Sequence, residues 1–248
     1  MPRKIKKHRK KKTKKKFLFL IILFSFGFII SYIFLIHFSN YQIKVINNND
    51  YFNAQIIQFQ NIIKNIPYFL IHKEKIKNKI LSTFPVISDI NLKFNFPKEF
   101  IFQIKEREPY ILICINSEKN CFVCDKEGII FLQTEKEKYN NLVYVIYNTE
   151  KNLNLGTKIL SEDIIEKIIE INKYFLSELK INISKFYLSE DFILTVKTAE
   201  KWKGIFDLSE NIKIQLIKLK LVLEQGVSEK ERQNLEYIDL RFKKVYVK

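Results

Sequence analysis

FPVISDINLKFNFPKEFIFQIKEREPYIL, residues 84–112, is the stretch of sequence that decides the fold. Apolar residues recur at every second position from Ile90 to Phe94 and again from Phe100 to Ile104. This period of two is typical of strands that bury one face. Residues 95–98 include a proline and separate the two runs, so they predict a turn between paired strands.

The residues before this stretch predict helices. Apolar residues recur at helical spacing in residues 53–64 and again in residues 73–84, where Pro85 ends the second run because proline donates no backbone hydrogen bond. Earlier still, residues 42–46 alternate as a strand does. The order strand, helix, helix, strand, strand predicts a small α+β domain over residues 38–108.

Residues 42–109 resemble the polypeptide-transport-associated (POTRA) domain of the FtsQ/DivIB family of bacterial division proteins. As in that family, a helix ends at Pro85 before Val86, Pro97 lies in the strand turn, and residues 106–109 read Glu-Arg-Glu-Pro. POTRA domains also precede outer-membrane barrels, which keeps a transport role open. For residues 106–109 we expect solvated charges at a strand end, with direct partner contact as the alternative.

Two contrasting segments precede this domain. Residues 1–16 contain eleven Lys and Arg, whereas residues 17–36 contain no charged residue. A helix of twenty residues spans ~30 Å, the thickness of the hydrocarbon core of a bilayer. We predict a basic cytoplasmic tail at 1–16 and one transmembrane helix at 17–37. A cleaved signal peptide is the alternative, but its apolar part is about 7 to 15 residues long and small residues follow it.

The position of the basic residues predicts the orientation. They precede the apolar run directly, so the positive-inside rule places the N-terminus in the cytoplasm and residues 38–248 outside it. The protein is then single-pass and type II in the plasma (inner) membrane. The formal net charge is +16, but the chain without its basic tail has 32 basic and 27 acidic residues. The excess charge therefore belongs to the membrane segment, and we expect no nucleic-acid partner.

Residues 109–248 predict a second domain, mainly antiparallel β with two helices. Strands are expected around 110–115, 121–124, 129–132, 142–147, 186, 192–196, 202–206 and 235–247. Helices are expected at 161–179, where Ser161 can cap the first turn, and after Ser209. Residues 125–128 end in a glycine and predict a hairpin turn.

The end of this domain strengthens the resemblance. The sequence YIDLRF, residues 237–242, is similar to the C-terminal strand of FtsQ. In that family a partner segment adds a strand beside the terminal strands, which implies FtsB and FtsL homologues as partners. The resemblance implies Tyr237, Asp239, Arg241 and Phe242 as partner-binding residues. A same-face charge pair between Asp239 and Arg241 is the alternative, and the sequence departs from the family from residue 243 onward.

Nothing in the sequence predicts catalysis, a cofactor or a metal site. The three histidines, His8, His37 and His72, all lie before the second domain, and the five glycines form no phosphate-binding loop. Cys121 and Cys124 lie in a predicted strand, so their side chains point to opposite faces and a redox or zinc pair is not expected. A disulfide between Cys114 and Cys121 is a hypothesis that requires the two strands to pair in register.

The resemblance thus implies a non-enzymatic scaffold of the division machinery (divisome). It would recruit and bridge FtsB/FtsL-type membrane proteins at the septum through its extracytoplasmic domains, without a small-molecule substrate. The alternative is a POTRA-containing membrane protein of a polypeptide transport or secretion system. Few ~10-residue strands follow the first domain, which counts against a barrel.

Overall fold

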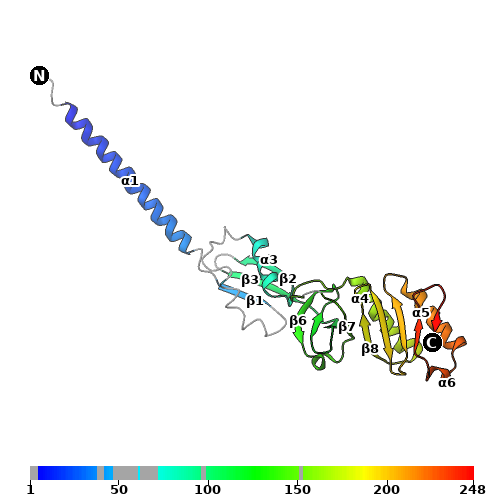
Figure 1. The fold of residues 1–248 in the computed structure, drawn as a ribbon. Coiled ribbons are helices and arrows are strands. Elements are labelled where there is room, and N and C mark those ends of the chain that lie inside the picture. The colour runs from blue at the N-terminus through cyan, green and yellow to red at the C-terminus, as the bar shows by residue number, and fades with distance from the viewer. Residues whose placement is uncertain (1–4, 38–41, 47–60, 62–71, 96–98, 151–152) are drawn as a thin grey trace. The chain divides into compact units, whose positions relative to one another are not determined.

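The computed structural model describes residues 5–37, 42–46, 61, 72–95, 99–150 and 153–248, and within the first helix it describes side chains from Lys16 to Tyr32. The chain separates into two compact units, which are described one at a time. Unit 1 comprises residues 1–83 and 89–105, and unit 2 comprises residues 84–88 and 106–248. The element order can be followed in Figure 1.

The first helix of unit 1, α1, runs from Ile5 to His37 and covers the range of the predicted transmembrane segment. Its described apolar side chains are exposed; Phe17, for example, is 67% exposed and Phe28 is 73% exposed. Within the described residues, however, no helix combines the length and the apolar character needed to cross a membrane.

The other elements described in unit 1 are a three-stranded sheet and a helix. The strands are β1 (Gln42–Ile46), β2 (Ile87–Asn95) and β3 (Glu99–Glu106), in the order β1-β3-β2. β1 runs parallel to β3, with Gln42 opposite Glu99. The helix α3 (Lys73–Thr83) buries Ile80 completely. These elements confirm the predicted strands and second helix. Apart from residue 61, the predicted helix at 53–64 lies outside the described residues, as does most of the predicted turn at 95–98.

Unit 2 contains a nine-stranded sheet in the order β12-β11-β10-β9-β8-β7-β4-β5-β6. Its strands are β4 (Ile111–Ile115), β5 (Cys121–Cys124), β6 (Ile130–Thr134), β7 (Tyr144–Tyr147), β8 (Ile183–Leu188), β9 (Ile193–Thr198), β10 (Lys203–Asp207), β11 (Tyr237–Asp239) and β12 (Tyr246–Val247). β7 pairs in parallel with both β4 and β8, and β10 pairs in parallel with β11. The remaining pairs are antiparallel, which confirms a mainly antiparallel sheet in a mixed α+β fold.

Two helices cover one face of this sheet. They are α4 (Glu162–Tyr174), extended by η4 (Phe175–Leu179), and α5 (Ile212–Leu221), extended by η5 (Val222–Gly226). The Ser161 hydroxyl accepts a hydrogen bond from the Ile164 amide and caps α4, as the sequence predicts. Two shorter helices were not expected from the sequence, η3 (Lys136–Tyr139) and α6 (Glu229–Arg232).

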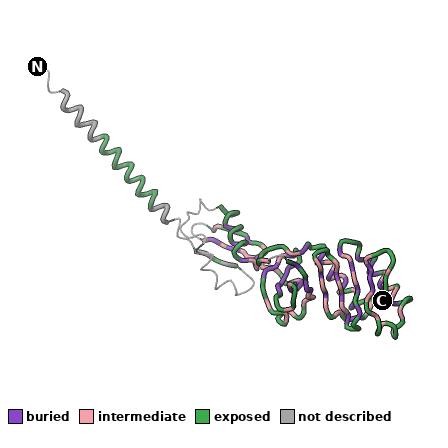
Figure 2. Tube along the Cα trace, viewed as in Figure 1, coloured by how far each residue is buried: buried purple, intermediate pink, exposed green. Residues whose placement is uncertain are grey.

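Alternate residues of the strands bury different faces of the sheet. One face joins α4 and α5 in a large core that includes Trp202, Phe175 and Phe206. The opposite face carries a smaller cluster built from Leu112, Cys114, Cys121, Val123, Phe131 and Ile146. Figure 2 shows buried and partly buried positions alternating along β8, β9 and β10, whereas β4 and β5 are buried almost throughout. This two-sided burial explains why β4 and β5 are apolar at nearly every position.

The predicted hairpin turn at 125–128 forms between β5 and β6. Gly128 has φ +88°, and its amide donates to the Asp125 carbonyl oxygen at 3.1 Å. A Cβ on Gly128 would lie 2.0 Å from the carbonyl oxygen of Leu160, so glycine is required both by the backbone angle and by the close approach.

The expectation of solvated charges at residues 106–109 is wrong for Arg107, which is largely buried. Its guanidinium lies 2.5 Å from the Asp125 carboxylate, and the two side chains are only 13% and 9% exposed. The Arg107 Nε also donates to the Pro85 carbonyl oxygen at 3.0 Å. Arg107 therefore ties residues 84–88 to the β5–β6 turn inside unit 2, which is a structural role that the sequence pattern alone does not reveal.

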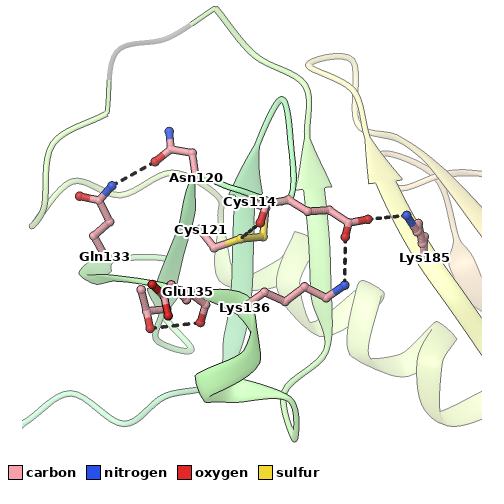
Figure 3. The surroundings of a disulfide bond; sticks show 9 residues. Cys114, Asn120, Cys121, Gln133, Glu135, Lys136 and Lys185 are labelled. Atoms are coloured by element: carbon pink, nitrogen blue, oxygen red, sulfur yellow. Dashed lines mark hydrogen bonds and ion pairs between the residues drawn. A yellow bond between two sulfur atoms is a disulfide. The ribbon is translucent and has the colours of Figure 1, made fainter.

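The hypothesis of a disulfide between Cys114 and Cys121 agrees with the structure. These residues lie directly opposite each other on β4 and β5, with 3.9 Å between their Cα atoms. Cys124 is a buried free thiol. Figure 3 shows Lys136 and Lys185 reaching one carboxylate of the same hairpin, that of Glu118, which pairs with the Lys136 ammonium at 3.2 Å. The β4–β5 hairpin is thus stabilised by the disulfide and by the ion pairs of Glu118 with the two lysines.

Candidate functional site

The candidate site is the end of the sheet formed by β11 and β12. β11 lies between β10 and β12, with Tyr237 opposite Lys203 on one side and Asp239 opposite Tyr246 on the other. β12 is the last strand in the order of described strands, so one of its edges is open to a further strand.

The predicted continuous strand at 235–247 is wrong. The chain leaves β11 after Asp239, turns, and returns as β12. Three hydrogen bonds stabilise the turn: the Leu240 amide donates to the Ile205 carbonyl oxygen, the Arg241 amide donates to the Asp239 carboxylate, and the Lys218 ammonium donates to the Phe242 carbonyl oxygen at 2.8 Å. Lys243 and Lys244 lie in the turn, where an exposed charge is easily solvated.

Asp239 and Arg241 form a bidentate pair. The Arg241 Nε and one terminal nitrogen donate to the two Asp239 carboxylate oxygens at 2.9 and 2.6 Å. The Asp239 side chain is 10% exposed and that of Arg241 is 32% exposed. The hydrogen bonds from Arg241 lower the pKa of Asp239, and the same contact raises the pKa of Arg241. The charge pair expected between these residues therefore forms, through a turn and not along a strand.

Exposed apolar side chains lie beside this pair. Phe242 is 50% exposed, Tyr246 52% and Val247 45%. The rings of Phe242 and Tyr246 meet edge to face, with 5.8 Å between their centroids, and the Arg241 guanidinium lies 5.2 Å from the Phe242 centroid. Because β11 ends at Asp239, the Phe242 ring is half exposed and does not share the buried environment of Ile238. Phe242, Tyr246 and Val247 together form an exposed apolar patch.

The open edge has a defined hydrogen-bonding direction. The amide and the carbonyl oxygen of Lys248 both bond to Tyr237, at 3.1 Å each. Since backbone groups alternate along a strand, those of Val247 point away from β11 and toward the open edge. A partner strand that pairs with β12 would form hydrogen bonds with these backbone groups of Val247.

The structure brings Asp239, Arg241 and Phe242 together, while Tyr237 lies half-buried at the start of β11. Sequence reasoning missed Tyr246 and Val247, which form the outer strand, and Lys218, which fixes the turn. The signal for β12 was present: the lysine pair at 243–244 separates two short runs rich in strand-forming residues. Among the described residues, no cluster of three or more His, Cys, Asp and Glu is placed to hold a metal ion.

Comparison with known protein families identifies the domain that contains the three-stranded sheet. Residues 38–107 match the family model described as the POTRA domain, FtsQ-type. This chain carries an FtsQ-type POTRA domain. The match confirms the predicted resemblance to the FtsQ/DivIB family over the POTRA domain, and it ends before the sheet of unit 2. No curated protein matches the chain.

Proposed function

We propose that this chain is a non-enzymatic scaffold of the bacterial division machinery, anchored in the plasma membrane and acting at the septum. The observation that carries the proposal is the FtsQ-type POTRA domain at residues 38–107, which fits a cell division protein. Its task would be to bind FtsB and FtsL homologues, and other division membrane proteins, without transforming a substrate.

Membrane attachment is supported by the sequence around α1. Residues 17–36 carry no charge, and eleven Lys and Arg precede them. The described side chains from Phe17 to Tyr32 are exposed on every side of the helix, an arrangement that suits a lipid environment. With the cations on the cytoplasmic side, the POTRA domain and unit 2 are extracytoplasmic in this proposal.

Partner binding is proposed at the open edge of β12. A partner strand would pair with the outward backbone groups of Val247, and backbone hydrogen bonds would supply the affinity. The Phe242 ring, with its neighbour Tyr246, offers apolar contact next to that edge. Arg241 is held by Asp239 in one orientation and presents a partly exposed cation. Tyr237 would contribute from the start of β11. The four predicted residues are therefore still proposed to bind the partner, with β12 as the edge strand beside them.

The strand-addition step is tested by Val247→Pro in the full chain. Proline removes the outward N–H of residue 247 and leaves the bonds of Lys248 to Tyr237 intact. We expect loss of copurification with the FtsB and FtsL homologues for Val247→Pro and retention for the matched control Val247→Ala. Full retention by a folded Val247→Pro chain contradicts strand addition.

The side-chain contribution has its own control. Phe242→Ala should weaken copurification, whereas Leu132→Ala, which removes a 40% exposed leucine from β6 at the other end of the sheet, should not. The cellular role is tested with a fluorescent fusion of the full chain. Enrichment at the septum supports the division proposal, and uniform envelope fluorescence favours a transport role.

A further inference from the structure

α5 exposes an apolar stripe on the side that faces away from the core. Its inner side buries Leu216 and Leu219 against the sheet. On the outer side Ile214 is 51% exposed, Ile217 57% and Leu221 48%. The spacing of three and four residues aligns them along one face of the helix. Single exposed apolar side chains are ordinary, but an aligned row of three β-branched or leucine side chains marks a contact surface.

Lysines border this stripe on both sides. If Ile214 and Leu221 are assigned to heptad position a and Ile217 to position d, Lys213 and Lys220 occupy position g and Lys218 occupies position e. These are the positions that select the charge of a neighbouring helix in coiled coils. We call the three apolar residues and the three lysines the α5 seam.

Two of the lysines are held in place by other elements. The Lys218 ammonium donates to the Phe242 carbonyl oxygen at 2.8 Å, and the Lys220 ammonium lies 3.7 Å from the Glu178 carboxylate at the end of η4. Their positive charges are therefore oriented before any partner arrives, which lowers the entropic cost of binding.

Acidic residues limit the seam at its two ends. Glu210 precedes the first turn of α5 and Glu224 follows its last turn, and both are exposed. The charge pattern along the helix is therefore acidic, basic in the middle, then acidic again. A partner therefore needs acidic residues opposite the lysines but not opposite Glu210 and Glu224.

We propose that the α5 seam binds an amphipathic α-helix of a partner protein, with apolar residues at its a and d positions and acidic residues at its e and g positions. The apolar rows interdigitate, and the acidic side chains reach the lysines on either side. This surface lies on α5, outside the open edge of β12, and it names a helical partner segment that the proposed function does not include.

Two other occupants fit the charges less well. A second copy of the chain would place lysines opposite lysines across a two-fold axis, which is repulsive. An anionic membrane is uniformly charged, so it would attract the lysines but repel Glu210, Glu178 and Glu224. A partner helix can carry acidic residues opposite the lysines alone, so it avoids this repulsion.

The experiment uses the full chain in nanodiscs of neutral lipid and two fluorescent 28-residue helical peptides. Both peptides carry Leu at a and d and Gln at the outer e and g positions. At the central e and g positions, which face the lysines of the seam, one peptide has Glu and the other has Lys. We expect at least tenfold tighter binding of the Glu peptide, measured by fluorescence anisotropy. Equal affinity of the two peptides overturns the proposal.

Variants locate the binding surface. Ile217→Ser combined with Leu221→Ser should weaken binding of the Glu peptide at least tenfold, because both side chains are exposed and the fold does not depend on them. Leu176→Ser removes a leucine that is 46% exposed on η4, outside the seam, and should change the affinity less than twofold. Unchanged binding by the double variant, or equal losses in the double variant and the control, refutes the assignment.

The other occupants have their own readouts. Binding of the chain to anionic vesicles that is lost in the double variant, without peptide binding, would assign the seam to a membrane surface. A sedimentation coefficient that rises with concentration in wild type but not in the double variant would assign it to a second copy. Either result overturns the helix proposal and leaves the test of β12 with its native partners unaffected.

Discussion

The link between Arg107 and Asp125 offers the sharpest test of how unit 2 is stabilised. Replacing Arg107 by Met keeps an unbranched apolar stem but removes the 2.5 Å ion pair and the 3.0 Å bond to the Pro85 carbonyl oxygen. Asp125 is then left as a buried charge without its counter-ion. Breaking such a pair costs about 3–5 kcal/mol, and we expect about 3 kcal/mol because Asp125 still accepts a hydrogen bond from the Ile129 amide at 2.9 Å.

The assay is urea unfolding followed by the fluorescence of Trp202. This residue is the only tryptophan in the sequence and is fully buried in the core of unit 2, so its emission reports that unit alone. With an m-value of about 2 kcal/mol per M, a loss of about 3 kcal/mol moves the midpoint by about 1.5 M.

Two comparisons make the result decisive. Lys126→Met removes a 57% exposed cation from the same turn and should move the midpoint far less than Arg107→Met, because exposed ion pairs contribute little to stability. Asp125→Asn removes the buried charge, so adding it to Arg107→Met should cost less than the sum of the two single changes by about 1 kcal/mol. If Arg107→Met shifts the midpoint no further than Lys126→Met, the buried link does not stabilise the unit.

Three further predictions use the same fluorescence assay. Asp239→Asn should lower the free energy of unfolding at pH 7 by about 1–2 kcal/mol. Arg241 lowers the pKa of Asp239 in the folded state, so the stabilisation by the charged Asp239 is complete above its unfolded pKa of about 4. The difference in stability between wild type and Asp239→Asn should vanish as the pH falls through the folded pKa. Gly128→Ala should cost about 2 kcal/mol or more because its Cβ would meet a carbonyl oxygen at 2.0 Å, whereas Gly226→Ala, with no neighbour closer than 3.8 Å, should stay within about 0.5 kcal/mol. Dithiothreitol should lower the stability of unit 2 by about 2 kcal/mol by opening the hairpin disulfide, and replacing both of its cysteines by alanine should abolish this sensitivity.

Much of the fold was readable from the sequence because each element has a distinct buried face. In β2 the residues Ile90 and Leu92 are buried and Asn91 is exposed, so alternation alone located the strand. The disulfide hypothesis held because Cys114 and Cys121 flank a short turn that sets their register. Local spacing was sufficient in both cases.

The remainder depends on contacts between residues far apart in the sequence. The parallel place of β7 between β4 and β8 comes from packing of the whole sheet, and no local pattern encodes it. The end of β11 depends on Lys218, 24 residues before the carbonyl group of Phe242 that it binds. Arg107 similarly acquires its role from Asp125 in a later hairpin. Among the candidate residues, Asp239, Arg241 and Phe242 lie together, but the chain turns after Asp239 and does not continue as the predicted strand.

The free thiol of Cys124 can report how often the sheet of unit 2 opens. It is fully buried, and burial raises its pKa far above the ordinary range, while the other two cysteines are bonded to each other. A thiol reagent therefore has one target in the folded chain and reaches it only when the sheet opens at β5. The rate of modification would report how often that opening occurs under native conditions, without denaturant.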